Sequence, residues 1–95
     1  MHNVLARITV KPEAAGAARD LLIDLAAKSR LESGCVAYAL YQQADAPHVF
    51  QTVEQWTEKA DADAHMATEH VGAAIAAATP LFAAPPEILA FTKLV

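Results

Sequence analysis

The sequence predicts an α+β domain in which two helices cover one face of an antiparallel sheet. Three observations favour this class. Alternate residues from 4 to 10 are all apolar, residues 13–29 repeat apolar side chains every three or four positions, and two later strand-like segments are separated by a short turn. Because 95 residues is the size of one domain, residues 1–95 are assigned to a single unit.

The first third of the chain is expected to form a strand, a helix and a turn. The alternation over residues 4–10 gives the strand one apolar face. Pro12 suits the first turn of the following helix, because an N–H group there has no helical partner to lose. The helix is expected over residues 13–29, and Glu32-Ser33-Gly34 is typical of a turn.

A hairpin is expected in the middle of the chain. Residues 35–42 form a strand in which neither face is polar, so both faces are expected to be covered. Residues 44–47 form a turn, and residues 48–56 form the third strand. The short connection favours antiparallel pairing of these two strands.

The last part of the chain is expected to add a helix and a strand. Thr57 is a plausible N-cap, and the helix reaches residue 79 either continuously or with a new start at Thr68. Pro80 ends it, and residues 87–94 form the last strand. The order strand-helix-strand-strand-helix-strand is the ferredoxin-like βαββαβ arrangement, with both helices on one face of an antiparallel sheet.

The composition indicates that a second copy of the chain covers the other face of the sheet. Apolar residues make up 55% of the sequence, above the usual range of about 45–50%. A domain this small buries only about 60–65% of its unfolded surface by itself, so the excess requires a partner or an apolar cavity. We expect both, in a homodimer that forms a dimeric α/β barrel.

Charge and cysteine content exclude several classes of partner. The net charge of −4 argues against nucleic acid and against anionic membrane surfaces. Cys35 is the single cysteine, which excludes an internal disulfide and favours a reducing compartment. Residues 1–10 lack the features of a signal peptide, and the apolar run at 71–78 is too short to span a bilayer. We therefore expect a cytoplasmic protein.

His65 and Glu54 are the candidate catalytic residues. If His65 faces the sheet, its imidazole can take a proton from a bound ligand, because histidine titrates near neutral pH. Glu54 shares a strand face with Trp56 and would orient the imidazole of His65 or His70, or would instead pair with an arginine or cap a backbone turn. Trp56 is expected mainly to pack in the core, with its indole N–H bonded locally.

A metal site is not expected. His65 and His70 are five positions apart, which places them about 140° apart on a continuous helix. A break at Thr68 would bring them together, but no third ligand stands at a convincing spacing. His70 is then a candidate for binding an anionic group at a helix N-terminus. The other two histidines, His2 and His48, are expected at the surface.

The turn before the second strand is expected to be structural. Arg30 and Glu32 would form a charge pair, and Gly34 would occupy a position of positive φ. Cys35 has no neighbouring base in the sequence, so it is expected to be a small buried residue and not a nucleophile.

The chain resembles the antibiotic biosynthesis monooxygenase family along almost its whole length. The matching segments are Arg7 to Pro12, Arg30 to Tyr38, Val53-Glu54-Gln55-Trp56, Ala64-His65, His70 and the terminal strand. The resemblance implies a dimeric ferredoxin-like barrel that holds a phenol, a quinol or a similar molecule between helices and sheet. It also implies that no cofactor is needed, because one branch of the family oxidises quinols or aromatic polyketides with O₂ and without metal or flavin.

The favoured hypothesis is a monooxygenase for a small aromatic or quinone-like substrate. His65 would serve as the base with Glu54 behind it, and the substrate anion would itself reduce O₂ in a dry pocket. The residues expected to bind the substrate are Trp56, His70, Phe50, Tyr38, Met66, Phe82 and Arg7.

Two other functions stay open from the sequence. An isomerase of a small phosphorylated carbonyl compound would use the same histidines, as another branch of the family does, and would need cations such as Arg7 and Arg30 at the pocket. A dimeric module that binds a small ligand without catalysis would be favoured by a pocket too small for an aromatic ring or by a solvent-exposed His65.

Overall fold

Four strands and three helices follow the predicted order, with the second predicted helix divided in two, in the computed structural model of residues 1–95. The elements are β1 (His2–Thr9), α1 (Ala15–Ser29), β2 (Cys35–Gln43), β3 (Ala46–Trp56), α2 (Lys59–Met66), α3 (Glu69–Ala78) and β4 (Glu87–Phe91). Short 3-10 helices precede α1 at Pro12–Ala14 and follow α3 at Thr79–Leu81. None of the helices combines the length and hydropathy needed to cross a membrane.

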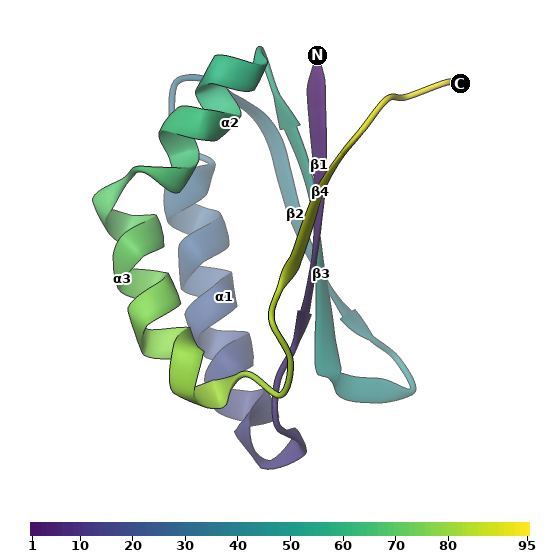
Figure 1. Ribbon diagram of the computed structural model, residues 1–95, viewed down its shortest axis with the longest axis vertical. Helices are drawn as coiled ribbons and strands as arrows, with labels where there is room; N and C mark the ends of the chain where they lie inside the picture. Colours follow the sequence, from purple (N-terminus) through teal and green to yellow (C-terminus); the bar gives the residue numbers. More distant parts are fainter.

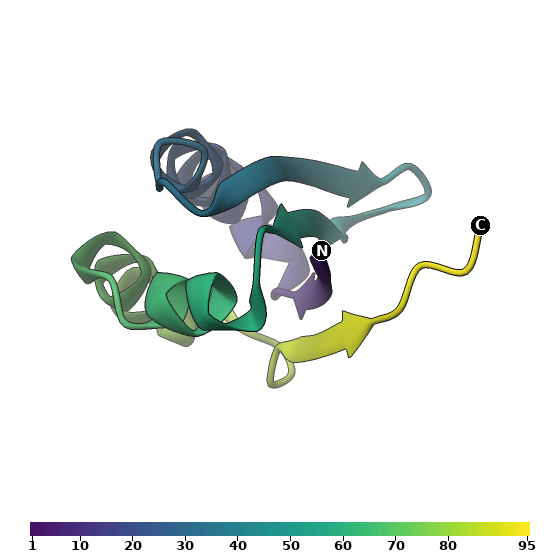
Figure 2. The ribbon, with the colours of Figure 1, turned by 90° about the horizontal axis from the view of Figure 1, so that it is seen from above.

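The strands form one antiparallel sheet in the order β2-β3-β1-β4. All three helices lie on one face of this sheet, and α1 and α3 pack side by side (Figures 1 and 2). This is the predicted ferredoxin-like α+β arrangement, which is confirmed. The last strand ends at Phe91 and not at Leu94, because its pairing with β1 runs only from Asn3 to Arg7.

The second predicted helix is divided into α2 and α3 at Thr68. Thr68 is extended, and its hydroxyl accepts a hydrogen bond from the Val71 N–H at 3.4 Å while donating to the His65 carbonyl at 2.7 Å. The predicted new start at Thr68 is therefore confirmed, with Thr68 as the N-cap of α3. The hydroxyl ties the end of one helix to the start of the next.

The N-cap of α2 is Glu58, so the prediction of Thr57 is wrong by one residue. Glu58 and Asp61 have the arrangement of a capping box, in which the Asp61 carboxylate accepts a hydrogen bond from the Glu58 backbone N–H at 3.0 Å. The Asp61 carboxylate thereby satisfies a backbone N–H at the start of the helix. The Thr57 hydroxyl instead donates to the Gly34 carbonyl at 3.4 Å.

The core between the helices and the sheet consists of two clusters of buried side chains. The first contains Ile8, Val10, Ala18, Leu22 and Phe50, and the second contains Val4, Ala26, Tyr38 and Trp56. Both clusters combine residues of α1 with the helix-facing residues of the sheet, because alternate strand positions face the helices. The space between sheet and helices that these clusters leave open is the candidate site.

The opposite face of the sheet carries a continuous apolar row in this single chain. The pairing registers place Ala39, Val53, Leu5 and Leu89 next to one another across all four strands. Val53 is 39% exposed, and Leu89, on the edge strand where it also borders the cavity, is 58% exposed. The covering of both faces that is predicted for the strand at residues 35–42 is therefore not formed within one chain.

Candidate functional site

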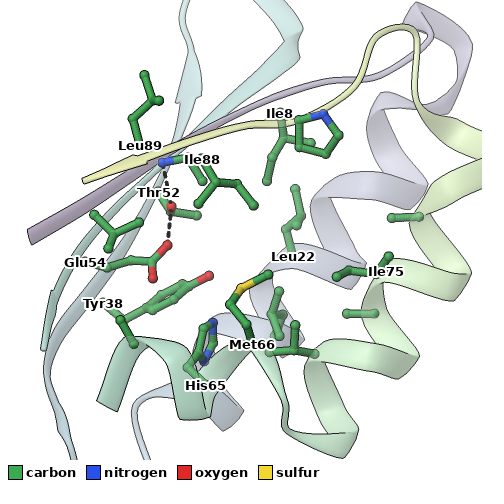
Figure 3. A pocket seen from close by; sticks show the side chains of 18 of the residues that line it. Ile8, Leu22, Tyr38, Thr52, Glu54, His65, Met66, Ile75, Ile88 and Leu89 are labelled. Carbon is green, nitrogen blue, oxygen red and sulfur yellow. Dashed lines mark hydrogen bonds between the residues drawn. The ribbon is translucent and has the colours of Figure 1, made fainter. Parts of the chain in front are cut away.

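A cavity of about 410 Å³ lies between the sheet and the helices (Figure 3). Of its 24 lining residues, 17 are hydrophobic, so a bound apolar molecule would contact mainly apolar side chains. The polar lining residues include Tyr38, Thr52, Glu54 and His65, which come from β2, β3 and α2. This volume is within the range of about 300–1,000 Å³ that is typical of small-molecule sites.

His65 and His70 both contact one carboxylate oxygen of Glu32. The Glu32 Oε2 atom lies 2.6 Å from the His65 Nδ1 atom and 2.9 Å from the His70 Nε2 atom. Glu32 lies in the turn between α1 and β2, while the histidines stand on either side of Thr68. The break in the helix is what allows two residues five positions apart to reach the same atom.

The Glu32 contact leaves one ring nitrogen of His65 free. An ionised carboxylate only accepts hydrogen bonds, so Nδ1 carries the hydrogen that His65 donates to Glu32. In the neutral ring Nε2 then holds a lone pair, and it has no partner in the protein. No fully buried side-chain nitrogen or oxygen lacks a partner, so Nε2 reaches accessible space, and His65 lines the cavity.

Aromatic neighbours fix the orientation of the His65 ring. The ring centroid of His65 lies 4.6 Å from that of Trp56 and 5.9 Å from that of Tyr38. Only 5% of His65 is exposed. Packing on two sides and a hydrogen bond on a third give a preorganised imidazole, which is what proton transfer at a defined atom requires.

Glu54 belongs to a separate network and does not orient either histidine. Its Oε2 atom accepts the hydroxyl hydrogen of Thr52 at 2.7 Å, and its Oε1 atom accepts the indole N–H of Trp56 at 3.1 Å. The Thr52 hydroxyl in turn accepts the backbone N–H of Ala6 at 3.2 Å (Figure 3). The predicted contact of Glu54 with a histidine, like the alternative pairing with an arginine, is not formed, because residues of its own strand face occupy both oxygens.

Tyr38 contributes a neutral phenol to the cavity wall. Burial raises the pKa of the Tyr38 hydroxyl far above its ordinary value, and the nearby Glu54 charge raises that pKa further. Burial, followed by the charges of Glu32 and Glu54, also raises the pKa of the Cys35 thiol. A thiol in this setting stays protonated, which agrees with the prediction that Cys35 is not a nucleophile.

The structure places only some of the predicted binding residues at the cavity. Tyr38, Met66 and Phe82 line it. His70 does not line it and contacts Glu32 instead. His2, expected at the surface, is half-buried and is one of the lining residues.

Three further residues expected at the cavity lie elsewhere. Trp56 is fully buried with its indole N–H bonded to Glu54, which confirms its expected core role and leaves no face for a substrate. Phe50 is 1% exposed and packs in the first core cluster. Arg7 is exposed and aligns with Gln51 and Glu87 on the sheet face away from the helices, so it cannot reach the cavity.

Glu32 is the residue that sequence reasoning missed. The expected pair with Arg30 is absent, since the Arg30 side chain donates to the Tyr38 carbonyl at 2.9 Å. Gly34 does not adopt a positive φ either. A Cβ atom at Gly34 would overlap the Asp61 side chain, so this glycine provides the close approach of α2 to the turn. No sequence signal links Glu32 to histidines 33 and 38 positions away.

Comparison with known proteins agrees with the fold and with the resemblance. The structure matches a protein described as antibiotic biosynthesis monooxygenase with a TM-score of 0.94, 28% identity and full coverage of both chains. It also matches a Pseudomonas aeruginosa protein (TM-score 0.91, 32% identity, 99% and 94% coverage) and a Mycobacterium tuberculosis protein (0.91, 28%, 99% and 95%). No curated protein sequence matches the chain. The family model described as "Antibiotic biosynthesis monooxygenase" matches residues 1–77, and the chain therefore belongs to this family.

Proposed function

We propose that the protein oxidises a small aromatic quinol or phenol with O₂ and that His65 accepts the phenolic proton. The observation that carries this proposal is the unpartnered Nε2 atom of His65, at the wall of an apolar cavity, with Glu32 fixing the opposite ring nitrogen. A base held through its second nitrogen by a carboxylate is an arrangement that activates hydroxyl groups in other enzymes. Family membership supports the monooxygenase reaction class.

Proton removal is the step assigned to the protein, and the substrate reduces O₂. The quinol gives its phenolic proton to Nε2, and the anion transfers electrons to O₂ far more readily than the neutral quinol does. Overall, one quinol and one O₂ give one hydroxyquinone and one water. One oxygen atom enters the ring, and the other leaves as water with two hydrogens of the quinol. The substrate supplies all four electrons, so this reaction needs no separate reductant.

The two alternatives have less support. A phosphorylated substrate requires free cations at the cavity. Lys59 is the single lysine or arginine in the cavity lining, and its exposed ammonium group pairs with Asp63 at 2.9 Å. Arg7 and Arg30 do not line the cavity. A module that binds a ligand without catalysis predicts a pocket too small for an aromatic ring or a solvent-exposed His65. The cavity has room for an aromatic ring, and His65 is buried.

The test is O₂ uptake with a panel of quinols and anthrones. The His65→Gln variant should lose about 10²–10⁴-fold in kcat, with little change in KM, because it removes the base and not the cavity. The matched control is His48→Gln, since His48 lies outside the cavity and the Glu32 contacts. Equal rates for His65→Gln and the wild type would remove His65 from the mechanism. A wild type that consumes no O₂ with any quinol would reject the reaction.

We also propose that the uncovered sheet face joins two copies of the chain. The apolar row across the sheet, which includes the exposed Val53 and Leu89, is the supporting observation. Sedimentation should give a dimer for the wild type and a monomer for Val53→Lys. Ile23→Lys is the control, because Ile23 is a comparably exposed apolar residue on α1. A monomeric wild type would contradict the proposal.

A further inference from the structure

We propose that Glu32, His65 and His70 bind a divalent transition-metal ion such as Zn²⁺, and that the bound ion prevents His65 from acting as a base. The three ligand atoms, Oε2, Nδ1 and Nε2, lie within 4.8 Å of one another. Two imidazoles and one carboxylate are a donor set that suits Zn²⁺ and its first-row neighbours. The binding part stands by itself, while the effect on catalysis rests on the proposed function.

The spacing of the three atoms requires only small movements. Ligands at about 2.0–2.1 Å from a tetrahedral ion are about 3.3 Å from one another. The distances of 2.6 Å and 2.9 Å from Glu32 to the two histidines must open slightly, and the two nitrogens already lie within 4.8 Å of each other. The ligands lie in a turn and on either side of a helix break, so these shifts disturb no strand register.

The Glu32 carboxylate is not held by another cation. The nearby Arg30 is bonded to the Tyr38 carbonyl, and the ion-pair contacts of Glu32 are with the two histidines alone. The His70 side chain is 23% exposed, which gives an ion a route from solvent and leaves room for water as a fourth ligand. The site is therefore open on one side, as zinc sites with three protein ligands usually are.

A metal ion on Nδ1 would change what His65 presents to the cavity. With Glu32 as the partner, Nδ1 carries the ring hydrogen and Nε2 offers a lone pair. Coordination uses the Nδ1 lone pair, so the hydrogen of the neutral ring has to reside on Nε2. His65 would then donate a hydrogen bond to the cavity and could no longer accept a phenolic proton.

The test of binding is Zn²⁺ titration of the protein without a histidine tag. The wild type should bind one Zn²⁺ per chain. His70→Gln and Glu32→Gln should each bind Zn²⁺ at least about 10- to 100-fold more weakly. Losing a residue that only supports a metal ligand through a hydrogen bond already lowers metal affinity by that factor. His48→Gln is the matched control and should bind as the wild type does. Circular dichroism checks that each variant is folded, and Co²⁺ should give the visible bands of a four-coordinate ion in the wild type and the control only.

The test of the effect on His65 is ¹⁵N NMR of its ring, with O₂ uptake measured in parallel. Zn²⁺ should convert Nε2 from an unprotonated to a protonated nitrogen and should stop quinol oxidation. Equal Zn²⁺ affinity in the wild type and His70→Gln would overturn the site. An unchanged Nε2 signal or full activity at saturating Zn²⁺ would overturn the inhibition. If Zn²⁺ binds and shifts the hydrogen in a protein that oxidises no quinol, the metal site stands and the proposed function fails.

Discussion

Two glutamates of this small domain, the buried Glu54 and the partly buried Glu32, have opposite surroundings. Glu54 accepts hydrogen bonds from a hydroxyl and an indole, and both donors are its neighbours on one strand face. Glu32 accepts from two imidazoles that come from two different helices. Indole and threonine groups do not titrate at ordinary pH, whereas imidazoles exchange protons and bind metals. The Glu54 network is therefore suited to holding the sheet and core together, and the Glu32 network is suited to chemistry.

The largest expected effect is a difference in the free energy of unfolding between variants of the two carboxylates. Glu54→Leu should lower the free energy of unfolding by about 3 kcal/mol, because two donors stay buried without an acceptor. Trp56 and Thr52 are 0% and 2% exposed, so water cannot replace the carboxylate. Glu32→Leu should cost less, about 1–2 kcal/mol, because it leaves one buried donor, the His65 Nδ1–H, while the partly exposed His70 can bond water instead.

Urea unfolding measures both values. All samples need the same protein concentration, because the stability of a protein that forms oligomers depends on concentration. The activities should rank the other way, with Glu32→Leu losing more quinol oxidation than Glu54→Leu when both are measured on folded protein. Equal stability losses in the two variants would remove the distinction between the networks.

The difference also explains which parts of the site could be predicted. The βαββαβ order follows from local periodicity, and the placement of Glu54 with Trp56 on one face follows from strand alternation. Their hydrogen bond joins residues two positions apart, so the sequence contains it locally. The contact of Glu32 with His65 spans 33 positions and depends on where a turn meets a helix, which no local pattern encodes.

The helix break was predictable only as an alternative. Thr68 is a good N-cap in any sequence, but whether it starts a new helix depends on packing. Once α3 starts at Thr68, His65 and His70 approach the same carboxylate. The sequence predicted no metal site because no third ligand stood at a convincing spacing. Glu32 meets the two histidines only through the tertiary structure, so spacing along the chain could not reveal it.

A second experiment tests whether the Glu32 turn needs the close approach of α2. Gly34→Ala should destabilise the protein by about 1–3 kcal/mol, because the added methyl overlaps the Asp61 side chain of the capping box. The control is Gly72→Ala in α3, where a Cβ meets nothing within 4 Å. That variant should gain about 0.5–1 kcal/mol from helix propensity. If Gly34→Ala is as stable as the wild type in urea, Asp61 has room to move and the contact does not fix the turn.

The smallest expected effect comes from Tyr38, whose phenol lies against the Glu54 network. Burial, and then the Glu54 charge, raise its pKa in the folded state, so above about pH 10 the unfolded chain loses the phenolic proton while the folded chain keeps it. The stability of the wild type should then fall with rising pH by up to about 1.4 kcal/mol per unit more than that of Tyr38→Phe. Below about pH 9 both states are protonated, and the two proteins should show parallel curves.

The measurement is the free energy of unfolding from about pH 8 to about pH 11 for the wild type, Tyr38→Phe and Tyr41→Phe. Tyr41 is 60% exposed, so its substitution is the matched control and should leave the alkaline slope of the wild type unchanged. The raised pKa of Cys35 affects all three proteins alike and cancels in the comparison. An alkaline slope that survives in Tyr38→Phe would place the ionising group elsewhere, and the Glu54 side of the cavity would then be wetter than its hydrogen bonds indicate.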